Sequence, residues 1–238
     1  MKIIAHRGAS GEFPENSLLA FEQAIEQGCD GIELDVQYHQ ASGEFIILHD
    51  QYLLFNNQRT HINQLSITEL LSNTPKKQGL CTLQQALATI AKQCTINIEL
   101  KSAVQGQQLR QEIIQLKQLL DNAITNNIVA TDQLTLSSFN HHALTCIKEL
   151  LPKVKTAALI ACCPLNYAQF CLPLKVSGLN LAIDCLNQEL ITDAKQRGLE
   201  VWVYTVDNLD DIKQCLAFGV DGIFTNYPER SRSHLLAL

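Results

Sequence analysis

The feature that most constrains the fold is the repeated alternation of short apolar runs with longer stretches of helical periodicity. The predicted strands are residues 3–5, 31–36, 95–100, 134–137, 155–159, 179–183, 200–205 and 222–224. The helices predicted between them are residues 17–27, 82–92, 105–122, 141–150, 167–172, 187–197 and 209–218. Eight strands alternating with helices in 238 residues predict an α/β fold, a (β/α)8 TIM barrel.

One segment interrupts this alternation after the second strand. Residues 44–50, "EFIILHD", have the composition of a further short strand. Residues 51–80 then separate it from the next helix, which is long for a loop and typical of a lid or a small inserted element. Residues 67–71 are predicted to form a short helix within it. We therefore expect a single domain over residues 1–238, with a short insertion at 51–80.

Composition excludes several classes of partner. Hydrophobic residues make up 46% of the chain and charged residues 18%, enough apolar material for a large core. A net charge of −6 argues against nucleic acid or an anionic membrane as the main partner. No segment suits a signal peptide or a membrane span. Nine scattered cysteines without a C-x-x-C pair predict reduced thiols in a cytoplasmic protein.

Three carboxylates are predicted to meet near the ends of neighbouring strands. Side chains two residues apart on a strand share a face, so Glu33 and Asp35 point the same way, as do Glu99 and Lys101 on the next strand. Read singly, each acid is more simply a solvent-facing group or an ion-pair partner. Buried together, the three carboxylates would repel one another unless a cation neutralised them. Hard oxygen ligands favour Mg²⁺, Ca²⁺ or Mn²⁺ over zinc.

Histidines and cations lie at the same predicted edge. His6 ends the first strand and His49 ends the extra strand, and a histidine pair there can give and take a proton. Arg7 offers a planar fork for phosphate oxygens and Lys101 a compact positive charge. These residues predict a pocket for a phosphate held on a metal. The histidines at 39, 61, 141, 142 and 234 lack this context and are expected at the surface.

Four short motifs carry a resemblance to a known family. They are H-R-G at 6–8, P-E-N-S at 14–17, E-L-D at 33–35 and H-D at 49–50, supported by E-L-K at 99–101 and G-V-D-G-I at 219–223. In order and spacing the chain resembles the glycerophosphodiester phosphodiesterases over essentially its whole length. The resemblance implies a metal-dependent barrel hydrolase for small glycerophosphodiesters, such as glycerophosphocholine or glycerophosphoethanolamine. The products would be sn-glycerol 3-phosphate and an alcohol.

The resemblance also implies a role for each matched residue. The implied metal ligands are Glu33, Asp35 and Glu99; the implied acid/base pair is His6 and His49; the implied phosphate and substrate contacts are Arg7, Lys101 and Glu15. One divalent ion, Mg²⁺ or Ca²⁺ with Mn²⁺ as a further possibility, is the implied cofactor. Which histidine is the acid, whether water or a glycerol hydroxyl attacks first, and the oligomeric state stay open.

The sequence departs from the family pattern at three places. Leu54-Phe55-Asn56 stands where R-T-T is common, Asp207 where the pattern has asparagine, and Asn226 where aspartate is frequent. None of these is a proposed ligand or histidine, so activity is expected to survive. The departures bear on the alcohol side of the substrate, because loops at the rim set selectivity.

Three other functions are compatible with such a barrel. A lysophospholipase D-like enzyme would want an apolar membrane-facing element, which the sequence lacks. A non-catalytic binding barrel would be expected to have lost one of the histidines or acids, and all are present. An aldolase or isomerase could use Lys101 in Schiff-base chemistry.

Overall fold

Eight parallel strands close into a barrel in the computed structural model, which describes residues 1–73 and 79–238. These strands are β1 (Lys2–His6), β2 (Gly31–His39), β6 (Thr95–Leu100), β7 (Leu134–Ser138), β8 (Lys155–Ile160), β9 (Gly178–Ala182), β10 (Glu200–Tyr204) and β11 (Gly222–Thr225). Each pairs with the next, and β1 closes the ring by pairing with both β11 and β2. The predicted (β/α)8 barrel is confirmed.

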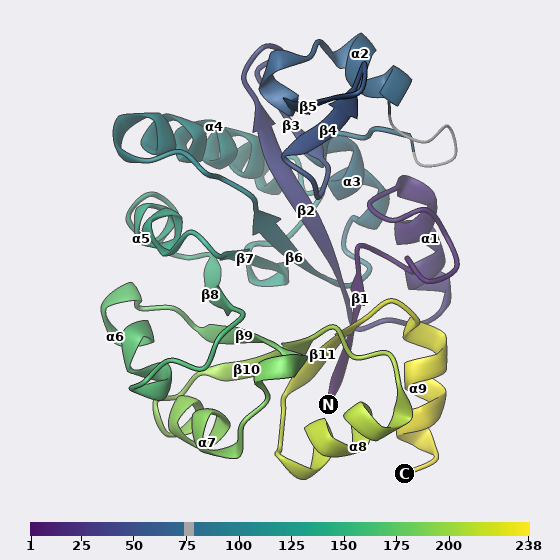
Figure 1. Cartoon of the computed structure of the whole chain (residues 1–238), viewed down its shortest axis with the longest axis vertical. Coiled ribbons are helices and arrows are strands. Elements are labelled where there is room, and N and C mark those ends of the chain that lie inside the picture. The colour runs from purple at the N-terminus through teal and green to yellow at the C-terminus, as the bar shows by residue number, and fades with distance from the viewer. Residues whose placement is uncertain (74–78) are drawn as a thin grey trace.

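Helices form the outer layer of the barrel (Figure 1). They are α1 (Leu18–Glu26), α3 (Leu83–Ile90), α4 (Gly106–Thr125), α5 (His141–Leu150), the 3₁₀ turn η3 (Tyr167–Phe170) with α6 (Cys171–Leu174), α7 (Gln188–Gln196), α8 (Leu209–Ala217) and α9 (Pro228–Leu236). Short 3₁₀ turns also precede β7 and follow β9, at η2 (Thr131–Gln133) and η4 (Ile183–Cys185). Helix α9 was not predicted, because only Pro228 and Ser231 of its residues are buried and it has no apolar periodicity.

The helix starts follow ordinary capping chemistry. The side chains of Ser17, Thr82, Asn140, Asn187 and Asn208 each accept a hydrogen bond from a backbone N–H of the first helical turn. These caps fix where each helix begins after the loop that leaves the carboxyl end of a strand. Each of these loops is therefore fixed by the strand before it and by the capped helix after it.

The main core lies between the strands and the helices. On β2, Ile32, Leu34 and Val36 are fully buried in this layer. Glu33 and Asp35 alternate with them and point into the barrel, as the period of two predicted. Because the apolar residues of β2 are buried against the helices, the alternation of side chains along the strand puts Glu33 and Asp35 inside the barrel.

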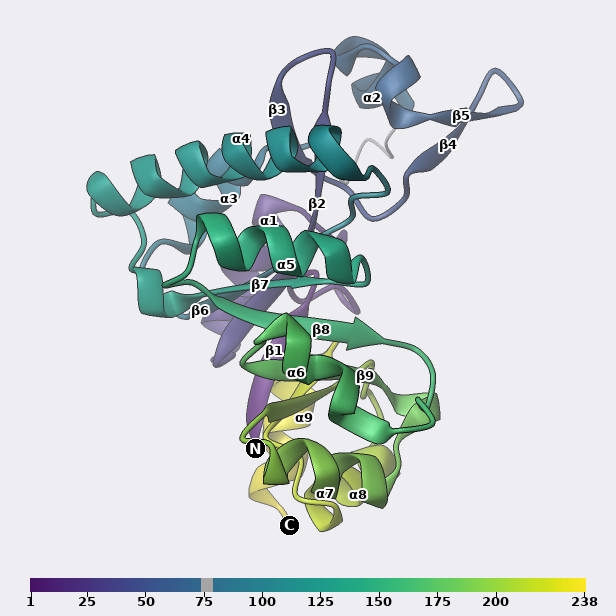
Figure 2. The same cartoon turned by 90° about the vertical axis from the view of Figure 1, so that its left-hand side faces the viewer.

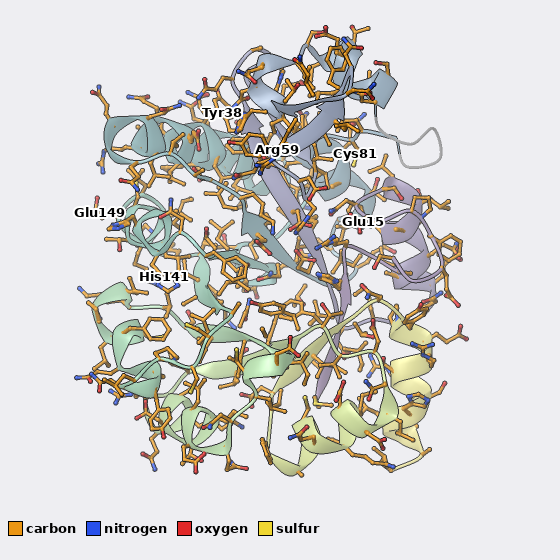
Figure 3. All side chains as sticks on the ribbon, viewed as in Figure 1. Glu15, Tyr38, Arg59, Cys81, His141 and Glu149 are labelled. Atoms are coloured by element: carbon orange, nitrogen blue, oxygen red, sulfur yellow. The ribbon has the colours of Figure 1, made fainter. Side chains whose placement is uncertain are left out.

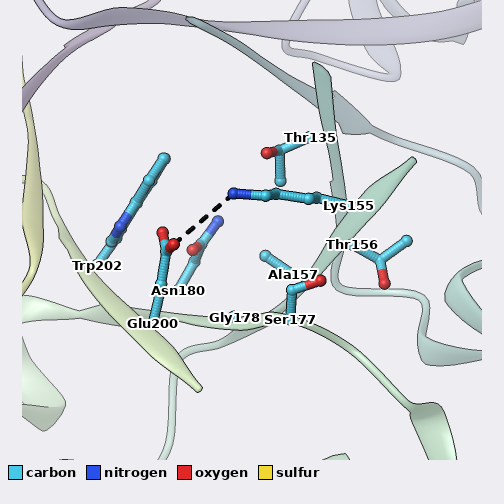
Figure 4. A pocket seen from close by; sticks show the side chains of 9 residues that line it. All are labelled: Thr135, Lys155, Thr156, Ala157, Ser177, Gly178, Asn180, Glu200 and Trp202. Carbon is cyan, nitrogen blue, oxygen red and sulfur yellow. Dashed lines mark ion pairs between the residues drawn. The ribbon is translucent and has the colours of Figure 1, made fainter. Parts of the chain in front are cut away.

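A small cavity lies at the amino ends of the strands (Figure 4). Its lining includes Asn180, Trp202 and the ion pair of Lys155 with Glu200, whose Nζ and Oε1 are 3.8 Å apart. Its volume is about 20 Å³, enough for one water molecule. This cavity is therefore too small for a phosphodiester.

The insertion after β2 is a small folded unit. It comprises β3 (Glu44–Ile47), the hairpin β4 (Tyr52–Phe55) and β5 (Gln58–His61), the 3₁₀ turn η1 (Ile62–Gln64) and α2 (Ile67–Asn73). Its own apolar cluster comprises Ile46, Leu48, Ile62, Leu65 and Leu70. Figure 2 shows the hairpin beyond the barrel on the side toward which β8 points. The insertion therefore stands at the carboxyl ends of the strands.

Two local expectations for this region need correction. The extra strand ends at Ile47, so His49 lies in the loop that follows it and not at a strand end. The hairpin was not predicted; its turn consists of Asn56 and Asn57, both with positive φ (49° and 61°), a conformation that asparagine tolerates. Residues 74–78 of the expected insertion lie outside the described residues.

His39 is a further correction. It was expected at the surface, but it is fully buried. Its Nδ1 lies 2.8 Å from Ser42 Oγ and its Nε2 2.9 Å from the carbonyl oxygen of Leu65. His39 thus joins β2 to the insertion. Within the described ranges, we find no helix with the length and apolarity to cross a bilayer.

Candidate active site

Three buried carboxylates converge inside the barrel. Asp35 on β2 stands opposite Glu99 on β6 in the strand register, and Glu33 precedes Asp35 by two residues. One oxygen from each lies within 4.8 Å of the others. Their exposed fractions are 3% for Glu33, 1% for Asp35 and 8% for Glu99. The predicted meeting of the three acids is therefore present.

Two cations contact this cluster. Lys101 Nζ lies 3.2 Å from Asp35 Oδ1 and 2.6 Å from Glu99 Oε1. Arg7 Nε lies 3.1 Å from Asp35 Oδ2, and its Nη1 lies 3.0 Å from Oε2 of Glu15, in the loop before α1 (Figure 3). Although burial raises the pKa of Asp35, the charges of Lys101 and Arg7 outweigh it and the pKa is lowered.

The backbone after β1 brings Arg7 to the cluster. Arg7 has φ of 58°, and its N–H donates to Glu33 Oε2 at 2.9 Å. Gly8 follows with φ of 79°, and a Cβ there would approach the carbonyl carbon of Ala20 to 2.7 Å. Only glycine fits this turn, which explains the G of the H-R-G motif. A residue held in the left-handed region beside a charged cluster is typical of a functional site.

In the two glutamates, unlike Asp35, the nearby cations do not outweigh burial and the neighbouring carboxylates. Burial, followed by the charges of Asp35 and Glu99, raises the pKa of Glu33 well above its usual range. Burial and the charge of Asp35 likewise raise the pKa of Glu99 to about 7. Glu33 Oε1 is buried without a hydrogen-bond partner among the described residues. Three hard oxygen donors with an unpartnered atom among them fit a divalent cation such as Mg²⁺ or Ca²⁺.

The raised pKa of Glu99 predicts how pH couples to metal binding. In the metal-free fold Glu99 holds its proton more tightly than in the unfolded chain, so its contribution to stability is lost as pH rises through about 7. A metal must displace this proton, and binding is therefore favoured at high pH. We expect the rise in Tm on adding Mg²⁺ or Ca²⁺ to chelated protein to be larger at about pH 8 than at about pH 6. Thermal melts at both values measure this; an equal or smaller rise at the higher pH contradicts it.

The histidines line the same pocket. It has a volume of about 280 Å³ and is lined by His6, Arg7, Glu33, His49, Asn97, Glu99, Lys101, Phe139, Leu159, Tyr204, Thr205 and Phe224. His6 Nδ1 lies 2.8 Å from Asn226 Oδ1, and His49 Nδ1 lies 2.9 Å from Asp50 Oδ1. Burial, followed by the charge of Arg7, lowers the pKa of His6. Asp35 and Glu15 are not among the lining residues, and each forms an ion pair with Arg7.

Several pocket residues were missed or misread in the sequence. Ser17, and not Asn16 before it, caps α1. The Asn16 side chain instead donates to Asp35 Oδ2 at 2.9 Å and accepts from the Asp35 N–H at 3.2 Å. Phe139 and Tyr204 form an aromatic wall, with ring centroids 6.2 Å apart at 89°. The N of the P-E-N-S motif was a signal for the first role, whereas nothing in the sequence indicated that the rings of Phe139 and Tyr204 meet.

At the mouth of this barrel, acids able to hold a cation meet two histidines and two cationic side chains in one pocket. Such a site suits hydrolysis of a phosphate ester, in which charge on phosphorus must be neutralised and protons moved. The geometry defines the broad class of phosphate-ester hydrolases, without specifying which kind of phosphate ester is cleaved.

Comparison with known proteins narrows the class. A sequence model described as the glycerophosphoryl diester phosphodiesterase family matches residues 6–230. YqiK of Bacillus subtilis is 32% identical over 249 residues, covering 98% of each chain. A glycerophosphodiester phosphodiesterase of Bacillus altitudinis is 30% identical over 244 residues, covering 97% of this chain and 96% of that one. The chain belongs to the glycerophosphoryl diester phosphodiesterase family of enzymes.

A solved structure supports the same assignment. A phosphodiesterase of Oleispira antarctica, in complex with the product sn-glycerol-3-phosphate, has a TM-score of 0.84 to this chain at 26% identity. The similarity covers 99% of this chain and 96% of that one. The insertion and the barrel are thus shared in outline with a structure that holds a glycerol phosphate.

Proposed function

We propose that this protein hydrolyses glycerophosphodiesters, such as glycerophosphocholine or glycerophosphoethanolamine, to sn-glycerol 3-phosphate and an alcohol. The observation that carries the proposal is one pocket lined by both histidines, both cations and two of the three clustered acids, Glu33 and Glu99. Family membership and the product complex of the Oleispira antarctica enzyme support it. The pocket volume of about 280 Å³ suits a substrate of this size.

Glu33, Asp35 and Glu99 would hold the divalent metal, Mg²⁺ or Ca²⁺, with Mn²⁺ as a further candidate. When bound, such an ion supplies Lewis-acid stabilisation of the charge on phosphate oxygens. The unpartnered Glu33 Oε1 and the raised pKa values of Glu33 and Glu99 support this, because a cation relieves both.

The chain's own groups would supply the remaining chemistry. Arg7 and Lys101 bind phosphate oxygens, with Glu15 holding the Arg7 fork in place. One of His6 and His49 accepts a proton from the nucleophile, and the other donates a proton to the leaving alkoxide. Both rings have their Nδ1 engaged, by Asn226 and by Asp50 respectively, so proton transfer in the pocket falls to Nε2.

The Schiff-base alternative is disfavoured by the surroundings of Lys101. Burial lowers its pKa, but the charges of Asp35 and Glu99 outweigh burial and raise the pKa above its usual value. A Schiff base requires a neutral amine, and Lys101 is held as a cation. A phosphate contact is the role that suits it.

The alcohol side of the substrate would meet the aromatic wall. Phe139 is 48% exposed, and it stands edge-on to Tyr204 at the pocket lining. An aromatic face attracts a quaternary ammonium group through the cation–π effect. We therefore propose that a choline head group is accommodated here.

We also propose that residues 1–238 constitute one domain containing the insertion at 51–80, since one closed barrel accounts for the strands at both ends of the described chain. A cytoplasmic location is proposed from the nine cysteines, all of which are free thiols.

The test of the function is release of glycerol 3-phosphate from glycerophosphocholine by purified protein, first chelated and then supplied with Mg²⁺ or Ca²⁺. We expect release only after the metal is restored. A phosphomonoester, offered in parallel, should not be hydrolysed. Absence of release from every glycerophosphodiester under both metals would overturn the proposal.

A further inference from the structure

Two residues outside the proposed catalytic set, Asp207 and Asn226, contact each other, and Asn226 also contacts His6. The loops after β10 and β11 run side by side, because the Val206 N–H donates to the carbonyl oxygen of Phe224 at 2.8 Å and so continues the pairing of these strands. This places Asp207 against Asn226, which in turn contacts His6. Both positions depart from the family pattern, and the structure shows that the departures touch.

The hydrogen bonds of Asp207 fix the orientation of the Asn226 side chain. Asn226 Nδ2 donates to Asp207 Oδ2 at 2.7 Å, and the Asn226 backbone N–H donates to Asp207 Oδ1 at 2.7 Å. The Thr225 hydroxyl also donates to Asp207 Oδ1, at 2.9 Å. A carboxylate has only acceptors, so it selects the NH₂ end of the amide. The amide oxygen of Asn226 must then point the other way, toward His6.

The amide oxygen in turn fixes the state of the His6 ring. Oδ1 accepts and cannot donate, so the 2.8 Å contact requires a proton on His6 Nδ1. When the ring is neutral, Nε2 is therefore free of a proton. The Ser10 hydroxyl lies 2.8 Å from the same Oδ1, but its one proton also has the His6 carbonyl oxygen as an acceptor at 2.6 Å, so the orientation of the amide rests on Asp207.

We infer that Asp207 and Asn226 are positioning residues for His6, a pair that sets its tautomer and directs Nε2 to the pocket. The inference rests on the proposed function, because it concerns the proton transfer assigned to His6. It also explains how a neutral amide can stand beside this histidine. The Asp207 carboxylate holds the Asn226 amide in the required orientation through their hydrogen bond. An exchange of the two side chains preserves the contact between them.

The test is a set of three variants at these two positions. In Asp207→Asn the amide of Asn226 can turn and present Nδ2 to His6, which favours the wrong tautomer. In Asn226→Asp two carboxylates face each other in place of a hydrogen bond. We expect each single variant to lower kcat about 10- to 100-fold with KM nearly unchanged. The double variant Asp207→Asn/Asn226→Asp re-forms the pair, and its kcat should recover to within a few fold of the original.

A control and a second readout make the outcome specific. Asp210→Asn makes the same carboxylate-to-amide change on a side chain that is 93% exposed, and it should leave kcat unchanged. In the metal-free protein, ¹H–¹⁵N NMR of the His6 ring should show the neutral form protonated on Nδ1, with Nε2 protonation appearing in Asp207→Asn. The tautomer is read without substrate or metal, so failure of the proposed function leaves this test intact. Two results would overturn the inference. One is a neutral His6 ring protonated on Nε2 in the original protein, and the other is a double variant whose kcat is no higher than that of the less active single variant.

Discussion

Replacement of His6 or His49 by alanine should lower kcat for glycerophosphodiester hydrolysis by about 100- to 10,000-fold, the range that positioned acid/base groups contribute. The two side chains reach the pocket from different segments, the end of β1 and the loop after β3. If they act in one proton-transfer sequence, the kcat of the double variant should be only slightly lower than that of the less active single variant, because the effects of groups that work as a unit are not additive. KM should change much less than kcat.

The measurement is a pH profile of kcat for each variant and for a matched control. His142→Ala removes an exposed histidine in the first turn of α5 that is not among the residues lining the pocket, and it should leave the profile unchanged. In His6→Ala the pH dependence should lose the limb that reports the pKa of His6, which burial and the charge of Arg7 lower in the original protein. Retention of most activity in His6→Ala, with an intact melt, would contradict the assigned role.

The barrel was predictable because its signals are local and repeated. On β2 and β6 the alternation of apolar and polar residues specifies both the strand and the face of each carboxylate, so Glu33, Asp35 and Glu99 could be placed together from spacing alone. Helix α5 was predicted to its last residue, since its apolar side and its Asn140 cap agree. Helix α9 and the β4–β5 hairpin were missed because they bury too few apolar side chains to produce a periodicity.

The parts of the site that escaped prediction are contacts between distant segments. Asn226 meets His6 across 220 residues of sequence, and Asn16 meets Asp35 across 19. A closed barrel makes β1 and β11 neighbours, but no period in one sequence specifies which side chains of the loops after them meet. His39 was misread for the same reason, since its partner Leu65 belongs to an insertion whose folding onto β2 was not foreseen.

Replacement of Glu33 by glutamine should weaken binding of the divalent metal by more than about 100-fold, above the 10- to 100-fold cost of removing groups one layer further from a metal. The change keeps the side-chain volume and an oxygen that can accept from the Arg7 N–H. It removes one of three charges that a divalent cation would neutralise. Activity at limiting metal should fall in parallel, and excess metal should restore part of it.

The opposite effect is expected on the stability of the metal-free protein. Glu33 is buried beside two carboxylates, and its raised pKa means that its negative charge destabilises the fold at neutral pH. Glu33→Gln should therefore raise the Tm of chelated protein while abolishing most of the further rise that metal gives the original chain. Glu112→Gln is the matched control, because Glu112, on α4, is also buried but accepts from Ser102 Oγ and is not one of the three clustered acids. Metal titrations followed by thermal melts separate the two effects; an unchanged metal response in Glu33→Gln would show that the three carboxylates do not hold the ion.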